Sequence, residues 1–171
     1  MKKRRILITS ALPYANSNQH LGNVAGAYLP ADIYARYQRL KGNEVLYICG
    51  SDEHGVPVTI SAMNEKTTPK TIIDKYHFEN KEAFEKLGIS FDNYSRTSAP
   101  IHHKTAQEFF LDLYQKGILK EKIDKQLFCV KDNMFLPDRY VEGECPFCGN
   151  QDARGDQCEK CGNILTPDTI K

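Results

Sequence analysis

Four cysteines near the end of the sequence have the spacing of a metal site. They form two pairs, CPFC at 145–148 and CEKC at 158–161, so the pattern is C-x2-C-x9-C-x2-C with a glycine directly after each pair. Two such turns can present four thiolates in a tetrahedron, and the glycines let backbone N–H groups approach the sulfur atoms. The pattern predicts one metal ion bound by Cys145, Cys148, Cys158 and Cys161.

Zinc is the favoured metal because it accepts tetrahedral sites of four sulfurs and has no redox chemistry. Mononuclear iron uses similar turns and remains an alternative, as do disulfides. Four protein ligands leave no open coordination position, so the expected role is structural. The other two cysteines, Cys49 and Cys129, lie within apolar runs and are interpreted as small buried hydrophobic residues.

A second candidate site lies in ALPYANSNQHLGN, residues 11–23, where His20, Gly22 and Asn23 fall at the expected start of a helix. Unpaired N–H groups and the positive end of the helix dipole make such a start a natural phosphate site. His20 can donate to a phosphate oxygen, Gly22 lets a flat base lie against the backbone, and Asn23 supplies an uncharged donor. Taken alone the pattern is short, because a histidine there is more often a helix cap or a surface residue.

The elements that position this loop follow from apolar patterning. The β-branched runs RILITSA at 5–11 and EVLYICG at 44–50 predict two buried strands. Between them, a three-to-four-residue spacing predicts a crossover helix over residues 21–42, marked by Leu29, Ile33, Tyr37 and Leu40. Pro30 should bend or divide that helix near 26–30, because proline lacks the N–H donor.

A strand, a helix and a second strand form a βαβ unit, which builds parallel sheets with ligand sites at the carboxyl ends of the strands. The loops after Ala11 and Cys49 are therefore expected to carry the chemistry. Asp52, just after the second strand, is well placed to pair with a cationic group. Alternatively, Asp52 and Glu53 form a charge pair that acts only on a helix dipole.

Further along, apolar spacing predicts two packing helices, one ending at Gly88 and one at Gly117, with a strand and its loop in residues 91–99. After Gly117 the residue pattern changes: apolar and charged residues alternate over 118–130, which predicts half-buried strands. We place a domain boundary there, between residues 1–117 and residues 118–171.

Composition restricts the classes of protein. The chain has 171 residues, of which 40% are hydrophobic and 26% are charged, with 23 Lys and Arg against 22 Asp and Glu and a formal net charge of +1. These values exclude a disordered or collagen-like chain and remove any whole-chain electrostatic argument for nucleic-acid binding. No apolar run is long enough to span a membrane, and the MKKRRILITSALPYA start lacks the apolar region of a secretory signal. We therefore expect a cytoplasmic protein that contacts no membrane.

Three segments, ALPYANSNQHLGN, YICGSDEHGVP and MFLPDRYVEGECPFC, resemble the methionyl-tRNA synthetases, a class I aminoacyl-tRNA synthetase family. The resemblance runs in order across nearly the whole chain. It implies an α/β, Rossmann-type parallel sheet that carries the class I signature, here HLGN, and is split by a small β and zinc-knuckle connective-peptide subdomain. It also implies activation of methionine with ATP and Mg²⁺, and transfer of the methionyl group to tRNA(Met).

The same resemblance assigns roles to individual residues. His20 would contact the ATP phosphates, Gly22 would lie against adenine, and Asn23 would replace the second signature histidine. Asn23 keeps hydrogen-bond donation but loses any positive charge. The implied methionine-binding residues are Ala11, Leu12, Tyr14 and Asp52. A core aromatic is the alternative interpretation of Tyr14.

On this resemblance the sequence stops inside the connective peptide. We therefore expect a monomeric fragment that lacks the Lys-Met-Ser-Lys-Ser loop and the anticodon-reading domain, and that is inactive alone. Three other functions remain open: a different class I synthetase, a nucleotidylyltransferase of the H-x-G-H type, and a zinc-ribbon module that binds RNA or protein through residues 118–171.

Overall fold

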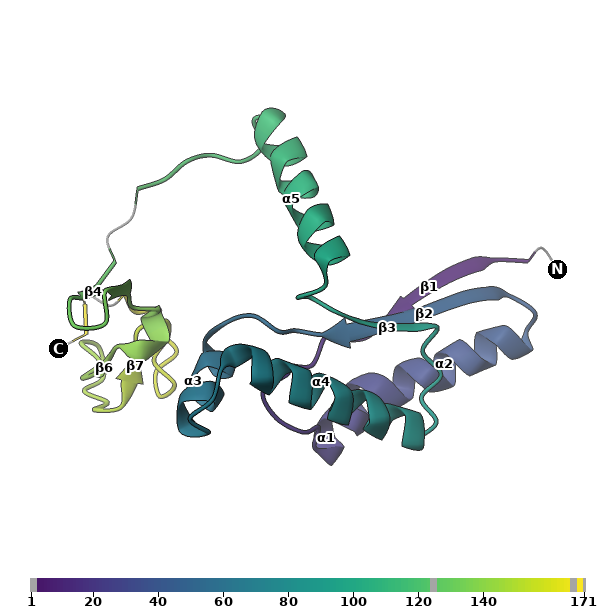
Figure 1. Ribbon diagram of the computed structural model, residues 1–171. Coiled ribbons are helices and arrows are strands. Elements are labelled where there is room, and N and C mark those ends of the chain that lie inside the picture. The colour runs from purple at the N-terminus through teal and green to yellow at the C-terminus, as the bar shows by residue number, and fades with distance from the viewer. Residues whose placement is uncertain (1–2, 124–125, 167–168, 171) are drawn as a thin grey trace. The chain divides into compact units, whose positions relative to one another are not determined.

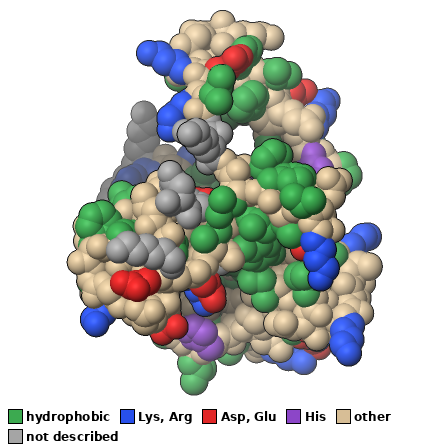
Figure 2. All heavy atoms as spheres, turned by 90° about the vertical axis from the view of Figure 1, so that its left-hand side faces the viewer, with side chains coloured by type: hydrophobic (Ala, Val, Ile, Leu, Met, Phe, Trp, Pro, Cys, Tyr) green, Lys and Arg blue, Asp and Glu red, His purple; other side chains and the backbone are tan. Residues whose placement is uncertain are grey.

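The computed structural model describes residues 3–123, 126–166 and 169–170 (Figure 1). The chain divides into two compact units, Met1–Ile118 and Leu119–Lys171, which are described separately below. In the described part of the chain, no helix is long and apolar enough to cross a membrane. On the face drawn in Figure 2, basic side chains are scattered among acidic and hydrophobic ones, which matches the near-zero net charge.

The first unit is built on a three-stranded parallel sheet, so the predicted α/β class is confirmed. Its strands are β1 (Arg5–Thr9), β2 (Glu44–Ser51) and β3 (Asn93–Arg96), in the order β1-β2-β3. The register pairs Ile6 with Val45 and Ile48 with Asn93. All three carboxyl ends therefore lie at one edge of the sheet. The first strand ends two residues earlier than expected, at Thr9, so Ser10 and Ala11 already belong to the loop.

The crossover between β1 and β2 is helical, with a widened turn near the expected break. It comprises α1 (Leu21–Asn23), the π-helical turn η1 (Val24–Tyr28) and α2 (Leu29–Leu40). The N–H of Leu29 reaches back five residues to the carbonyl of Val24. Pro30 lies in the first turn of α2, where a missing N–H donor costs little. Pro30 thus follows a widened π-helical turn within a continuous helical run and does not divide it.

The buried face of α2 differs from the apolar stripe that predicted the helix. Leu29, Ile33, Tyr37 and Leu40 are all exposed, Leu40 to 87%. Ala35 is fully buried instead, in a core shared with Ile8, Tyr28, Tyr47 and Phe84. Its small side chain lets the helix approach the sheet closely. Figure 1 shows α2 and α4 on the same side of the sheet, whose other face carries the exposed Leu7 and Leu46.

Asp32 on the buried side of α2 supports a first prediction. Its carboxylate accepts hydrogen bonds from the N–H and Oγ of Ser90, at 2.6 and 2.5 Å, and from Nε of Arg36 at 2.6 Å. Burial alone would raise the pKa of this carboxyl, but the hydrogen bonds from Ser90 and then Arg36 outweigh it and hold the pKa below its usual value. The stabilisation is present above the unfolded pKa of about 3.9 and is lost as the pH falls through the lower folded pKa.

We expect Asp32→Asn to lower the free energy of unfolding by about 1–3 kcal/mol at neutral pH, because a buried charge-assisted network loses its charge. The difference from the unchanged protein should shrink in acid, and urea denaturation at a series of pH values measures it. The same deficit at neutral pH and at about pH 2 would contradict this account.

Two further helices follow β2. Helix α4 (Pro69–Lys86) was predicted and begins at the cap Thr68, whose side chain accepts from the N–H of Thr71. Helix α3 (Val56–Asn64) was not predicted, because the sequence before it was interpreted only as a loop. Gly55 adopts φ +102° at its start, a conformation that favours glycine. The two helices share a core formed by Ala15, Val58, Ala62, Ile72 and Ile73.

The second predicted packing helix forms but does not pack as expected. It is α5 (Pro100–Gln115), and none of its residues is buried. Phe109 and Phe110, which mark the apolar spacing, are 66% and 57% exposed. The spacing therefore predicted the helix and not its surroundings.

The second unit has little regular structure. It contains β4 (Phe128–Cys129), β5 (Met134–Phe135), the 3₁₀ turn η2 (Asp138–Tyr140), β6 (Glu142–Gly143) and β7 (Ala153–Arg154), paired as two short antiparallel hairpins. The half-buried strands expected over 118–130 are wrong except at Phe128–Cys129, and Ile123 is 99% exposed; residues 124–125 lie outside the described residues. The core of this unit comprises Cys145, Ala153, Cys158 and Leu165. Two of those four residues are candidate metal ligands.

Candidate active site and metal centre

The loop after β1 lines a cavity of about 390 Å³ in the first unit. Four of the predicted site residues are loop residues that line it, namely Ala11, Leu12, Tyr14 and His20, and Asn23 at the start of the helical crossover is a fifth. The other lining residues are Pro13, Asn16, Ser17, Gln19, Ala27 and Tyr28. Tyr14 is 49% exposed, so it is not a core aromatic. The cavity is thus bounded by the loop and the amino-terminal part of the helical crossover.

His20 is the cap of the first helix. Its Nδ1 accepts a hydrogen bond from the N–H of Asn23 at 3.3 Å, and its carbonyl accepts from Asn23 and Val24 at 3.0 and 3.2 Å. A neutral imidazole whose Nδ1 accepts must carry its proton on Nε2. The cap therefore leaves Nε2–H as the donor that can serve a ligand.

Gly22 has a role that the sequence did not reveal. A Cβ placed there would lie 3.0 Å from both Cε1 and Nδ1 of the His20 ring. The absence of a side chain at Gly22 thus makes room for the capping imidazole. Asn23 is held by a hydrogen bond from its Nδ2 to Oε1 of Gln19, 3.1 Å away.

Asp52 joins this site through its backbone. Its N–H donates to the carbonyl of Pro13, and its own carbonyl accepts from the N–H of Ala15, both at 2.8 Å. These bonds make an isolated parallel bridge between Asp52 and Tyr14, although Asp52 does not line the cavity itself. The next helix has Gly55 as its cap and no acidic residue in its first turn, so a purely dipolar role for Asp52 is not supported.

Glu53 is a functional candidate, although from the sequence it was named only as part of a charge pair with Asp52. Its side chain is fully buried, and Nε of Arg96 lies 2.8 Å from each carboxylate oxygen. Ser51 Oγ donates to Oε1 at 2.7 Å, and Ser98 Oγ donates to Oε2. Its backbone N–H donates to Oγ1 of Thr97 at 2.9 Å. The sequence feature that could have indicated a role for Glu53 is its place just after a buried strand.

Cys49 lies beside a second, smaller cavity of about 200 Å³, which is lined by Thr9, Ser10, Leu12, Ile48, Cys49, Gly50, Ser95, Arg96, Thr97 and His102. Burial raises the pKa of the Cys49 thiol to about 11. The thiol is therefore protonated at neutral pH and is a poor nucleophile. Cys49 was predicted to be a buried hydrophobic residue, but it is only partly buried, and Cys129 likewise.

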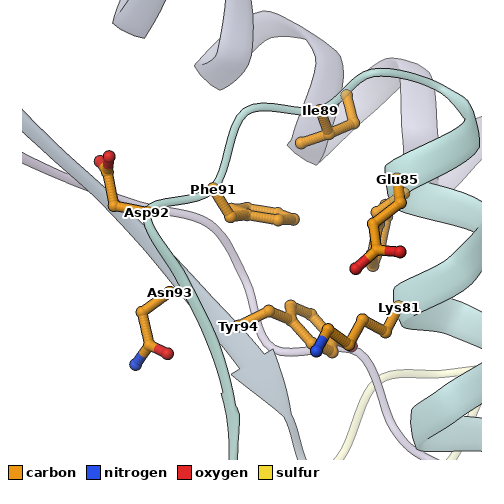
Figure 3. Close-up of a pocket in the computed structure, with 8 residues that line it drawn as sticks. Lys81, Glu85, Ile89, Phe91, Asp92, Asn93 and Tyr94 are labelled. Carbon is orange, nitrogen blue, oxygen red and sulfur yellow. The ribbon is translucent and has the colours of Figure 1, made fainter.

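A third cavity, of about 240 Å³, lies between α4 and the segment leading into β3. Figure 3 shows Phe91 and Tyr94 projecting toward α4, where Lys81 and Glu85 lie, whereas Asp92 points away. None of the residues predicted from the sequence lines this cavity. The loop cavity is therefore the candidate active site.

The four clustered cysteines of the second unit are brought together. All four Sγ atoms lie within 4.8 Å of one another, and they could hold a metal ion. Cys145 and Cys161 have their sulfurs 3.8 Å apart, and Cys148 and Cys158 have theirs 3.6 Å apart. A disulfide would need about 2.05 Å, so these four are free thiols.

The two cysteine turns repeat the same hydrogen bonds. In the first, Gly149 donates to the carbonyl of Cys145, and in the second Gly162 donates to that of Cys158, at 2.9 and 2.8 Å. Both glycines have positive φ, +68° and +74°. The backbone N–H of Cys161 and then that of Lys160 lower the pKa of the Cys158 thiol to about 6. At Cys148 the backbone N–H of Asn150 is outweighed by burial and by hydrogen bonds with the other three thiols, which raise the pKa of that thiol. A thiolate is the form that binds a metal.

Comparison with known proteins shows which family this chain belongs to and which proteins it is similar to. Residues 6–171 match the family model described as tRNA synthetases class I (M). The methionine--tRNA ligase of Chloroherpeton thalassium is 58% identical over 98% of this chain and 24% of its own length. That of Thermococcus kodakarensis is 55% identical over 97% of this chain and 22% of its own length. The chain thus spans about a quarter of the length of these curated relatives.

A solved structure supports the fold independently. The chain is similar to Mycobacterium tuberculosis methionyl-tRNA synthetase in complex with methionyl-adenylate, with a TM-score of 0.73 and 24% sequence identity. The similarity covers 95% of this chain and 30% of that one. At this level of identity, the match establishes a shared fold.

Proposed function

This chain belongs to the class I (M) tRNA synthetases, and from that premise we propose that the protein activates methionine with ATP and transfers the methionyl group to tRNA(Met). The observation that carries the proposal is the loop cavity, where His20 at a helix start lies with Leu12 and Tyr14. Asp52 is hydrogen-bonded to the same loop through its backbone. The loop thus brings together a hydrogen-bond donor for phosphate, His20, and the apolar side chains of Leu12 and Tyr14. The acidic residue Asp52 is bonded to the same loop.

His20 and Asn23 serve ATP in this proposal. The Nε2–H of His20 donates to a phosphate oxygen, and the N-terminal N–H groups of the helical crossover add to the positive potential there. Asn23 supplies a further uncharged donor in place of a histidine. Gly22 lies against adenine, and its lack of a side chain also keeps the His20 ring in place. Mg²⁺ accompanies ATP as its counter-ion.

Methionine binds in the same cavity, against the residues that directly follow β1. Ala11, Leu12 and Tyr14 form the wall for its side chain, and the Asp52 carboxylate pairs with its α-ammonium. One carboxylate oxygen of the bound methionine attacks the α-phosphorus of ATP, and the bond to the pyrophosphate oxygen breaks. No protein group needs to form a covalent bond, so the residues act by positioning the two substrates and by stabilising the developing phosphate charge.

We propose Zn²⁺ as the metal held by the four cysteines. Zinc binds thiolate at about 2.3 Å, so a regular tetrahedron has sulfurs about 3.8 Å apart. Two of the six sulfur–sulfur separations, at 3.6 and 3.8 Å, fit this value, and all six are within 4.8 Å. With four protein ligands the ion would hold the fold of the unit and leave no position for substrate.

A replacement at Gly22 tests the placement of His20. Because a Cβ would lie 3.0 Å from the ring, Gly22→Ala should swing the imidazole off its cap. We expect the KM for ATP to rise by about 10-fold and the KM for methionine to stay within about twofold. Steady-state kinetics with each substrate varied in turn measure the split, and Gly26→Ala, where nothing lies within 4 Å of the added Cβ, is the matched control.

The other functions considered from the sequence each explain only one part of the chain. A nucleotidylyltransferase accounts for the loop and a zinc-ribbon module accounts for the cysteines, whereas the family match spans both. The relatives with 55–58% identity are named methionine--tRNA ligases, so a synthetase for another amino acid is also disfavoured. We retain the cytoplasm and a monomeric state as proposals, and sedimentation measures the second.

Charging of tRNA tests the proposal as a whole. The protein expressed from the longest reading frame that contains this chain is incubated with unfractionated tRNA, ATP, Mg²⁺ and each radiolabelled amino acid. We expect acid-precipitable label with methionine alone. Charging with a different amino acid, or with none, would overturn the proposal.

A further inference from the structure

Six polar side chains form a cluster next to Asp52, three of them buried (Ser51, Glu53 and His77) and three partly exposed, and the proposed function leaves them without a role. They come from the carboxyl end of β2, from α4, and from β3 and the loop after it. We call them the Glu53 cluster: Ser51, Glu53, Asp74, His77, Arg96 and Ser98.

An ion pair lies at the centre of the cluster. Glu53 is fully buried, and Arg96 bonds both of its oxygens through Nε while its Nη2 reaches Oδ1 of Asp74 at 2.7 Å. Buried ion pairs rarely stabilise a fold more than apolar side chains of the same shape would. Their best-supported use is to fix one arrangement out of several. The cluster is therefore a candidate for a positioning role.

Ser51 and His77 extend the arrangement. Ser51 is fully buried, and its single hydroxyl proton goes to Oε1 of Glu53 at 2.7 Å. Its contact of 2.7 Å with His77 must then be a hydrogen bond donated by Nδ1–H of the ring. Burial and the nearby Arg96 charge lower the pKa of His77, so the ring is neutral at pH 7. Each bond thus has one defined direction.

The residues directly before and after Asp52, Ser51 and Glu53, both belong to the cluster. In an extended segment, successive side chains point to opposite sides, so Ser51 and Glu53 enter the cluster while Asp52 faces away from it. The backbone is tied as well, because Glu53 N–H donates to Thr97 Oγ1 and Thr97 N–H donates to the carbonyl of Ser51 at 3.0 Å. Asp52 itself is bonded to Pro13 and Ala15. The backbone at Asp52 therefore has little freedom to rotate.

We propose that the Glu53 cluster positions the Asp52 carboxylate for the α-ammonium group of the amino-acid substrate, with Glu53 and Arg96 as its principal positioning residues. The inference rests on the proposed function, because it requires that Asp52 bind this ammonium group. It predicts that weakening the cluster impairs methionine binding specifically. Loss of rigidity at Asp52 should leave the ATP contacts at His20 unaffected.

The test uses ATP–pyrophosphate exchange by the protein from the longest reading frame. Glu53→Gln keeps the shape of the side chain and removes its charge, and Ser98→Ala removes one hydrogen bond without leaving a buried charge unpaired. We expect Glu53→Gln to raise the KM for methionine by about 10-fold, and Ser98→Ala to raise it by less. The KM for ATP should stay within about twofold in both.

Asp32→Asn is the matched control. It also removes charge from a buried, ion-paired carboxylate, but on α2 and outside the cluster. We expect it to lower the melting temperature as Glu53→Gln does and to leave the KM for methionine within about twofold. This separates loss of positioning from general loss of stability.

Three outcomes would overturn the inference in distinguishable ways. If Asp52→Asn raises the KM for methionine but Glu53→Gln and Ser98→Ala do not, the cluster is only structural. If Asp32→Asn raises that KM as much as Glu53→Gln does, the effect follows stability. If the unchanged protein shows no methionine-dependent exchange, the proposed function itself fails, and the inference fails with it.

Discussion

His20→Ala is expected to slow methionine-dependent ATP–pyrophosphate exchange by about 100- to 1000-fold, the range for removal of one preorganised hydrogen-bond donor to a developing oxyanion. The cap hydrogen bond from Asn23 to Nδ1 fixes the ring and leaves its proton on Nε2. Alanine removes both the donor and the cap. The exchange rate at saturating ATP and methionine measures the effect.

His103→Ala is the control for this replacement, because His103 is a histidine on α5 that lines neither the loop cavity nor the second cavity. It should leave exchange within about twofold of the unchanged protein. Exchange by His20→Ala at the unchanged rate would show that the loop does not bind the ATP phosphates.

Metal removal should have the second large effect, confined to the unit Leu119–Lys171. Among the described residues of that unit, the buried core comprises four residues, of which Cys145 and Cys158 are candidate ligands. Zinc bound to such turns contributes on the order of 10 kcal/mol to folding. We therefore expect chelation, or Cys145→Ser, to abolish hydrogen-exchange protection across 142–165, while α4 in the other unit stays protected.

Cys129→Ser is the matched control within the same unit. Cys129 lies outside the four-sulfur cluster and has its sulfur 3.1 Å from Oδ2 of Asp132. This variant should bind the metal and keep its protection, whereas Cys145→Ser should bind less than one equivalent. Retained protection in the chelated protein would contradict a structural role for the metal. Elemental analysis of the purified protein separates zinc from iron.

The parts of the fold that depend on local pattern were predictable. The two β-branched runs became β1 and β2, and Pro30 marked the place near which the structure has a π-helical turn. The buried face of α2 was not predictable from hydrophobicity, because it depends on partners distant in sequence. Asp32 is buried since Ser90, far along the chain, donates to it twice. Helix α3 was missed because the segment after the second strand was interpreted only as a loop, although the proline in its first turn is typical of a helix start.

In the candidate site too, residues within a local motif could be predicted and contacts between distant residues could not. His20 and Tyr14 could be proposed from a continuous motif, and the cysteine spacing alone indicated a metal site. Glu53 could not be assigned a role, because its partner Arg96 comes from another strand and only the fold joins them. The contact between Gly22 and the His20 ring was equally invisible, since it depends on the direction of a capping side chain.

The most direct test of the central claim is ATP–pyrophosphate exchange by the protein from the longest reading frame, measured with each of the twenty amino acids in turn. The claim predicts exchange with methionine alone, and its loss in both His20→Ala and Asp52→Asn. Exchange that is independent of methionine, or that persists in both variants, would contradict the assignment of this loop as the site of methionine activation.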